Sequence, residues 1–337
     1  MAALGKKTYK SLAKLIGLGL LLYMLSILNY HKLLIGIRDS RPVFILIAFL
    51  FLIPVYVIKA FRWRFMLSLQ GVHYPYRDSF LAFWASNFIA FITPGRFGEV
   101  AKAFYLMKDK NLPFSTSLPT VIFDRLFDMY TLFFFSVMGM LVFSASTNNW
   151  QHWAVIVPLL LLPLLVFWEK AITWFARRIF SLPLLKSYRV RFNNGLKSFY
   201  CEMSSLLTFR SLFGLILSMA AYILLFFCSW WISKASASDL SFMRVGYFMA
   251  MVAILSFLPI TVAGFGTREA ALVVLFGQIG KSPEEAILFS TLYFLVFFVL
   301  GGVMGYFCFL LKPLEFRALK SFVRDQKGHE AASLKTN

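Results

Sequence analysis

Long apolar runs alternate with short polar segments along most of the chain. A helix that crosses the hydrocarbon core of a bilayer needs about 20 consecutive, mostly apolar residues. The pattern therefore predicts an all-α integral membrane protein with about six full transmembrane helices. We expect the spans at residues 11–30, 42–61, 118–144, 153–168, 211–233 and 286–311.

Two further apolar runs, 79–93 and 246–263, are shorter and end at glycine-containing breaks, TPGRFGE and TVAGFGTRE. Another short apolar run follows each break. We interpret both as broken helical hairpins that are re-entrant, so that each enters and leaves the membrane on the same side. Irregular backbone at membrane depth is tolerated only where it is buried in protein or lines a water-filled cavity.

The distribution of basic residues predicts the orientation. With the N-terminus inside and both hairpins re-entrant, the inward segments hold 26 Lys and Arg residues and the outward segments hold 6. An excess of Lys and Arg marks the cytoplasmic side of a membrane protein. We therefore expect a multi-pass protein of the cell inner (cytoplasmic) membrane with both termini in the cytoplasm. The inward segments are 1–14, 59–78, 96–112, 169–210 and 312–337.

The order of elements repeats along the chain. A shift of 170 positions places Glu99 on Glu269 and Pro113 on Pro283, and it moves two predicted spans onto two later ones. The repeated unit is a span, a broken hairpin and a span. Because the two hairpins would enter from opposite sides, the sequence predicts an inverted repeat, whose paired breaks mark a binding site near the midplane. The expected parts are an N-terminal helix and outer loop (1–41), the first repeat (42–144), a helix with a basic cytoplasmic connector (145–210), the second repeat (211–314) and a cytoplasmic tail (315–337).

Composition agrees with a membrane protein and excludes several other classes. Of the 337 residues 60% are hydrophobic and 15% are charged, whereas a soluble domain is about 25% charged. The net charge of +19 lies in short segments between apolar runs, which is typical of cytoplasmic loops rather than of a nucleic-acid-binding face. The three cysteines suggest no disulfide framework. We expect no cofactor, no metal site and no catalytic residue, since no nucleotide, zinc or hydrolase motif occurs.

The first break carries the chemistry of an anion site. Pro94 and Gly95 must interrupt the helix, and a helix that restarts at about Phe97 would leave amide groups free to bind an anion. Arg96 would add a charged fork suited to phosphate.

The second break has the same arrangement, with Gly264, Gly266 and Arg268. Two such breaks that meet from opposite sides could hold a lipid phosphate. The plainer alternative is that Glu99 and Glu269 only stabilise the starts of their helices.

A third charged stretch, FDRLFDMY, places Asp124 and Asp128 on one face of a predicted helix, with Arg125 three residues before Asp128. One reading is a charged wall in which Arg125 contacts the substrate. The other is an internal ion pair that fixes this span against the first hairpin. The pattern leaves both open.

These stretches resemble a known family. TPGRFGEVAKAFYL, FDRLFD and AGFGTREAAL are similar to the signature sequences of the lysylphosphatidylglycerol synthase transmembrane region, also called the flippase-like domain family, and the resemblance covers roughly residues 10–315. It implies a substrate-binding role for Arg96, Gly98, Glu99, Arg125, Asp128, Gly266, Arg268 and Glu269. Our candidate binding residues add Asp124 and Gly264 to these.

The resemblance also implies a function. In members linked to multiple peptide resistance, this region is associated with moving an aminoacylated phospholipid that a separate soluble domain makes. The chain ends soon after its last predicted span, so we expect a translocase of a phospholipid or of a lipid-linked phosphate or sugar rather than a synthase. The expected partners are the bilayer and an anionic phospholipid or polyprenyl-phosphate-type lipid, and no nucleic acid.

Two alternatives remain open from the sequence. The protein could be a non-transporting accessory or scaffold subunit for a lipid-modifying glycosyl- or aminoacyl-transferase, or it could itself be a transferase that uses its carboxylates. A partner transferase and a homodimer are both compatible with the chain.

Overall fold

The computed structural model describes residue 38 and residues 40–143, 189–255 and 266–314. The regular elements of this part are all helices, and four are long and apolar enough to cross a membrane: Pro42–Leu69, Phe114–Val142, Phe209–Ala235 and Pro283–Leu311. They confirm an all-helical membrane protein and lie where spans 42–61, 118–144, 211–233 and 286–311 were predicted. The predicted spans 11–30 and 153–168 fall outside the described residues.

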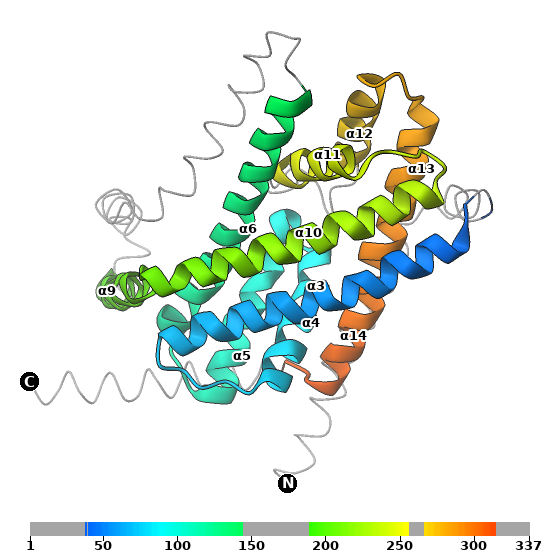
Figure 1. Cartoon of the computed structure of the whole chain (residues 1–337). Coiled ribbons are helices and arrows are strands. Elements are labelled where there is room, and N and C mark those ends of the chain that lie inside the picture. Colours follow the sequence, from blue (N-terminus) through cyan, green and yellow to red (C-terminus); the bar gives the residue numbers. More distant parts are fainter. Residues whose placement is uncertain (1–37, 39, 144–188, 256–265, 315–337) are drawn as a thin grey trace, which may run out of the picture.

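Helices α3 (Pro42–Leu69) and α10 (Leu212–Ala235) pack along each other. They run in opposite directions: the Arg41 amide at the start of α3 donates to the Ala235 carbonyl at the end of α10, at 3.1 Å. At the other end of the pair, Gly214 of α10 lies against Met66 of α3. The two helices are so close there that a Cβ added to Gly214 would lie 2.7 Å from the Met66 side chain. Figure 1 shows the pair crossing the front of the molecule.

The first predicted hairpin forms three consecutive helical segments. These are α4 (Tyr76–Ile92), a 3-10 helix η1 (Pro94–Val100) and α5 (Ala101–Lys110). The start of α4 and the end of α5 lie together, because Lys312 binds both Asp78 (2.6 Å) and Asp109 (2.7 Å). The segment thus returns to the end of the bundle where it began.

The remaining helices complete two similar sets. After α6 (Phe114–Phe143) and α9 (Arg189–Leu206) comes η4 (Phe209–Ser211), which leads into α10. Two short helices, α11 (Phe242–Leu255) and α12 (Thr267–Gly277), then precede a long helix. That helix consists of α13 (Pro283–Phe294), a π-helical turn η5 (Leu295–Leu300) and α14 (Gly301–Leu311).

The two sets pack across each other. Helix α4 lies on α14, where Trp84 donates to the Gly301 carbonyl at 3.0 Å. Helix α11 lies on α6, where a Cβ on Gly139 would overlap the Tyr247 ring. The first short helix of each set therefore packs on the long helix of the other set. The division into repeats itself stays a prediction.

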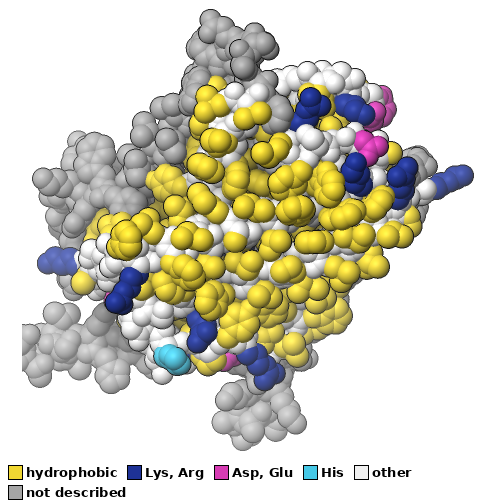
Figure 2. Space-filling model, viewed as in Figure 1, with side chains coloured by type: hydrophobic (Ala, Val, Ile, Leu, Met, Phe, Trp, Pro, Cys, Tyr) yellow, Lys and Arg dark blue, Asp and Glu magenta, His cyan; other side chains and the backbone are white. Residues whose placement is uncertain are grey.

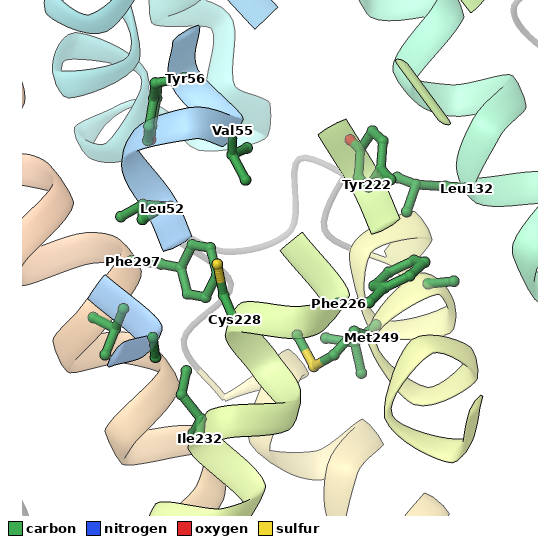
Figure 3. Packing of buried hydrophobic residues seen from close by; sticks show 14 of the residues in the cluster. Leu52, Val55, Tyr56, Leu132, Tyr222, Phe226, Cys228, Ile232, Met249 and Phe297 are labelled. Carbon is green, nitrogen blue, oxygen red and sulfur yellow. The ribbon is translucent and has the colours of Figure 1, made fainter. Parts of the chain in front are cut away.

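The core lies between α3, α10 and the helices behind them. Figure 3 shows Phe297 of η5 beside Cys228 of α10, both within one continuous cluster of buried apolar residues. The outer face of α3 and α10 is also apolar, with Leu46 (59% exposed) and Ile216 (60%) among its residues. In Figure 2, apolar side chains cover this face, and Lys and Arg gather toward its two ends. A surface of this kind suits contact with lipid.

A smaller cluster closes one end of the bundle. Phe199, Met203 and Leu206 of α9 pack against Met66 of α3 and Phe127 of α6. Helix α9 belongs to the basic connector predicted over 145–210, and its apolar residues face the bundle.

Candidate functional site

The centre of the site is formed by two pairs of charged residues, one on α3 and one on α6. Lys59 and Arg62 of α3 lie three residues apart, and Asp124 and Asp128 of α6 lie four apart, so each pair occupies one helix face. The faces meet: Arg62 binds Asp124 (2.6 Å) and Asp128 (2.7 Å), and Lys59 binds Asp128 (2.9 Å). Arg62 also contacts Ser218 of α10 and has no exposed surface. Three helices are joined at this point.

Lys102 of α5 extends the contacts toward the first break. Its ammonium group binds Asp124 at 2.6 Å and Glu99 at 3.2 Å. It also lies 4.6 Å from the centroid of the Phe83 ring. Like Arg62, Lys102 has no exposed surface. It therefore connects the α3–α6 ion pairs to the carboxylate of η1.

Glu99 holds the remaining two arginines. Arg125 of α6 binds it at 2.8 Å and also donates to the Arg96 carbonyl at 3.0 Å. Arg96 approaches the same carboxylate only to 3.9 Å and donates to Asn87 at 3.0 Å. The internal ion pair anticipated for Arg125 is therefore present.

These contacts form one continuous chain, which we call the polar network. Its carboxylates are Glu99, Asp124 and Asp128, and its cations are Lys59, Arg62, Arg96, Lys102 and Arg125. Among the described residues these contacts join three carboxylates to five cations. Ionisable groups inside a membrane bundle are expensive and typically mark a functional site.

The backbone of the first break differs from the expectation. Instead of a helix that restarts at about Phe97, the 3-10 helix η1 continues to Val100, and α5 begins at Ala101. The Gly98 amide is bound by the Thr93 hydroxyl at 2.7 Å, so it is not open to an anion. One of the amides expected to be free at this break is therefore occupied by a side chain of the preceding turn.

Gly98 and Arg96 have different roles in η1. A Cβ on Gly98 would lie 2.6 Å from the backbone of Ile89 and Ala90, so glycine permits η1 to pack on α4. Arg96 has a φ of 56°, a left-handed conformation that costs a non-glycine residue about 1–2 kcal/mol. Its buried Nε makes no hydrogen bond within the described residues. Strain of this kind is often found at functional sites.

The third sequence motif forms a separate, charge-balanced cluster. Arg268 of α12 donates to Glu269 (2.6 Å) and to the Ser290 hydroxyl (2.8 Å), and Ser290 donates to Glu269 (2.8 Å). Glu269 also accepts from the Gly266 amide at 2.7 Å. Gly266, with a φ of 80°, provides the turn before α12. Glu269 thus stabilises the start of α12, as the alternative to a binding role predicted. It also binds the Arg268 guanidinium.

Two aromatic rings connect the two clusters. The Arg268 guanidinium lies 5.5 Å from the Phe298 ring centroid, and Phe298 packs on Phe91 with 4.9 Å between the ring centroids. The Arg96 guanidinium lies 5.5 Å from the centroid of the same Phe91 ring. The Arg96 end of the polar network and the α12 cluster are therefore neighbours.

The structure brings most of the predicted residues together. Arg96, Glu99, Asp124, Arg125 and Asp128 are in the polar network, Gly98 supports it, and Gly266, Arg268 and Glu269 form the second cluster. Gly264 lies outside the described residues. In the described part, no group of three or more His, Cys, Asp or Glu side chains could hold a metal ion.

Sequence reasoning missed Lys59, Arg62 and Lys102. The predicted span ends at residue 61 and the predicted inward segment 59–78 includes Lys59 and Arg62, but α3 continues to Leu69. The apolar residues after Arg62 and its three-residue spacing from Lys59 were the signal that could have placed both on the helix.

Comparisons with known proteins agree on one family. The model of the lysylphosphatidylglycerol synthase TM region matches residues 11–305. A UPF0104 membrane protein of Methanocaldococcus jannaschii is 24% identical over an alignment of 314 positions, and the alignment covers 87% of this chain and 93% of the relative. Another, from Methanothermobacter thermautotrophicus, is 20% identical over 86% of this chain and 91% of that protein. No solved structure matches the chain. Since the family model covers most of its length, the chain belongs to the lysylphosphatidylglycerol synthase TM region family of multi-pass membrane proteins.

Proposed function

We propose that the protein moves a lipid with an anionic phosphate headgroup from one leaflet of the cytoplasmic membrane to the other, without a covalent intermediate. The observation that carries the proposal is the polar network, which places five cations and three carboxylates within an apolar helix bundle. An uncompensated charge in a membrane costs at least about 2.5–3.5 kcal/mol even on lenient scales. A polar lining lowers that cost for a crossing headgroup.

In the proposed mechanism the headgroup contacts Arg96 and Arg125, while its acyl or prenyl tails remain in the bilayer. Arg268, which lies near Arg96 through the packed rings of Phe298 and Phe91, meets the headgroup from the second repeat. The short helices α4 to α5 and α11 to α12 are re-entrant, both termini are cytoplasmic, and rocking of one repeat against the other exposes the site alternately. Downhill movement requires no energy source.

The test is a lipid-scrambling measurement with the purified protein in liposomes. Fluorescent phosphatidylglycerol is present in both leaflets, and a membrane-impermeant quencher reports the fraction that reaches the outside. We expect wild-type protein to accelerate quenching and Arg96→Ala or Glu269→Ala to abolish the acceleration. Lys281→Ala, which changes a cation outside both clusters, is the matched control and retains activity.

A second outcome favours the accessory role. If wild-type protein leaves the lipid in its leaflet, and a lipid-modifying transferase works only when the protein is present, the translocase proposal fails. Equal scrambling by wild type and Arg96→Ala would also contradict it, since the polar network would then have no part in transport.

A further inference from the structure

We propose that Lys312, Asp78 and Asp109 form a latch. The latch holds the first hairpin, which runs from α4 through η1 to α5, closed on the end of α14, and it opens each time a lipid is moved. The opening during transport rests on the proposed function, whereas the closed contact is a feature of the structure itself.

One side chain binds both ends of the first hairpin. The Lys312 ammonium group, directly after α14, contacts Asp78 at the start of α4 (2.6 Å) and Asp109 at the end of α5 (2.7 Å). It also lies 5.2 Å from the centroid of the Tyr74 ring. The Tyr74 hydroxyl in turn donates to Asp109 at 2.6 Å. These contacts hold the two ends of the hairpin together and fasten both to α14.

Helix α5 also binds the backbone at the end of α14. The Tyr105 hydroxyl donates to the Lys312 carbonyl at 2.8 Å, and the Lys108 ammonium group donates to the Pro313 carbonyl at 2.9 Å. Carbonyl groups at the end of a helix have no partner within that helix, and a cation beside them is favourable. Helix α5 therefore caps α14, and the cap and the latch would separate in the same movement.

The latch is a contact that can open at little cost. The Lys312 side chain is 12% exposed, Asp109 is 21% exposed and Asp78 is 42% exposed. Ion pairs that water can reach are individually weak. Arg62, with no exposed surface, is different, because loss of its contacts would leave buried carboxylates without that partner. Of these two sets of ion pairs, the latch is the one suited to repeated opening.

Helix α5 connects the latch to the polar network. Lys102, near the start of α5, binds Asp124 of α6 and Glu99 of η1. Asp109 lies seven residues later, which places it on the same face of the helix. The helix has only ten residues, so a movement of its latched end away from α14 would also shift Lys102. Opening of the latch would thus rearrange the site proposed to meet the headgroup.

The other end of the molecule lacks the charges for such a latch. Moved by the predicted 170-residue relationship, the three latch residues fall on positions of the other repeat that are all apolar. These are Val142, Phe248 and Ile279. The corresponding positions therefore cannot form ion pairs, and the two ends differ in how a hairpin is held. In the predicted orientation the latch closes the cytoplasmic end.

A reversible cross-link tests whether the latch has to open. In a chain whose native cysteines are replaced, Asp109→Cys and Lys312→Cys are joined by a short bis-methanethiosulfonate reagent, and scrambling of fluorescent phosphatidylglycerol in liposomes is measured. We expect the cross-linked protein to lose scrambling and a thiol reductant to restore it. A contact that only stabilises the fold would tolerate the cross-link, so undiminished scrambling would overturn the latch.

The matched control joins two positions within the first hairpin. Tyr74→Cys with Asp109→Cys removes the same aspartate, but this cross-link does not attach the hairpin to α14. We expect the cross-linked control to scramble as well as its reduced form. Loss of scrambling with both cross-links would show that the hairpin must bend rather than leave α14, and it would also overturn the proposal.

A second measurement does not depend on transport. Cys308 lies three residues after Gly305, on the face of α14 that packs on α4, and is 6% exposed, whereas Cys228 of α10 has no exposed surface. In a Cys201→Ser background, Lys312→Met should make N-ethylmaleimide label Cys308 at least about fivefold faster and leave Cys228 unchanged. Lys281→Met is the control and should label as the background does. Peptide mass spectrometry reads both sites.

The two measurements separate this inference from the proposed function. Equal acceleration at Cys308 and Cys228 would report a general loss of stability, and no acceleration at Cys308 would show that Lys312 does not hold α14 closed; either result overturns the latch. Faster labelling of Cys308 alone, in a protein whose wild type does not scramble lipid, would refute the translocase and keep the opening contact. Scrambling that continues through the Asp109–Lys312 cross-link would refute the latch alone.

Discussion

At the scale of single residues, Arg62 has the most demanding position in the molecule. It is fully buried and is the shared partner of Asp124 and Asp128, which come from a different helix. Its guanidinium also donates to the Asp124 carbonyl at 3.1 Å. Arginine suits this role because its planar fork offers several donors in fixed directions. Lysine could not reproduce all of these contacts.

We expect Arg62→Met to destabilise the protein by about 3–5 kcal/mol, because two buried carboxylates lose a charged partner at once and each keeps only one cation. The shift is measured as the midpoint of denaturant unfolding in detergent. Arg77→Met replaces an exposed arginine at the start of α4 and should change stability by no more than about 0.5 kcal/mol. Equal midpoints for the two variants would show that the α3–α6 ion pairs contribute little.

The candidate site could be predicted from the sequence only in part. Arg96, Glu99 and Asp124 were found because charges inside apolar runs are conspicuous in one dimension. Arg62 was missed because its partners, Asp124 and Asp128, lie more than sixty positions later in the chain, at separations of 62 and 66 residues. Spacing within one helix is visible in a sequence, but the pairing of two helix faces depends on tertiary packing.

At the scale of elements, two glycines allow helices to cross closely. Gly305 of α14 lies where a Cβ would be 2.8 Å from the Phe88 Cβ and 3.1 Å from the Trp84 carbonyl. Gly139 of α6 has the corresponding place against α11. Small residues commonly permit such approach in membrane helices. Gly305 therefore permits the close packing of α14 on α4.

We expect Gly305→Ala to lower stability by about 1–3 kcal/mol, because backbone and Cβ atoms of α4 cannot move aside as a side-chain tip could. Gly277→Ala is the matched control: a Cβ added to Gly277 would have no described atom within 4 Å, so this substitution should be neutral or slightly stabilising. Thermal unfolding in detergent compares the two. A Gly305→Ala protein as stable as wild type would mean that α4 and α14 can separate without cost.

The elements themselves were more predictable than their junctions. The four long helices follow from apolar length, which is a local property of the chain. The end of α3 and the path of η1 were not predicted, because both depend on contacts: Arg62 is tolerated in a helix only with its two aspartates, and η1 is held by the Thr93 hydroxyl.

At the scale of the whole molecule, the position of α10 agrees with that expected from α3 by the predicted 170-residue relationship. Helix α3 moved by that shift begins at residue 212, where α10 begins, and the two run in opposite directions. In Figure 1, α5 lies near one end of the bundle and α12 near the other, beside α13. Residue identity between the halves is poor, so the similarity is one of element order and packing.

The two short-helix pairs provide the decisive test of the inverted arrangement. Neither α4, with 17 residues, nor α5, with 10, reaches the ~20 residues of a full span. If both pairs are re-entrant, Arg77→Cys and Lys110→Cys should react with an impermeant thiol reagent from one side of the membrane. Ser241→Cys and Gln278→Cys should react only from the other. All four positions are exposed, and a background without the native cysteines gives the baseline. Labelling of Arg77→Cys and Lys110→Cys from opposite sides would mean that this segment crosses the membrane. The polar network would then lie in an ordinary span, and the alternating access proposed for the two repeats would lose its structural basis.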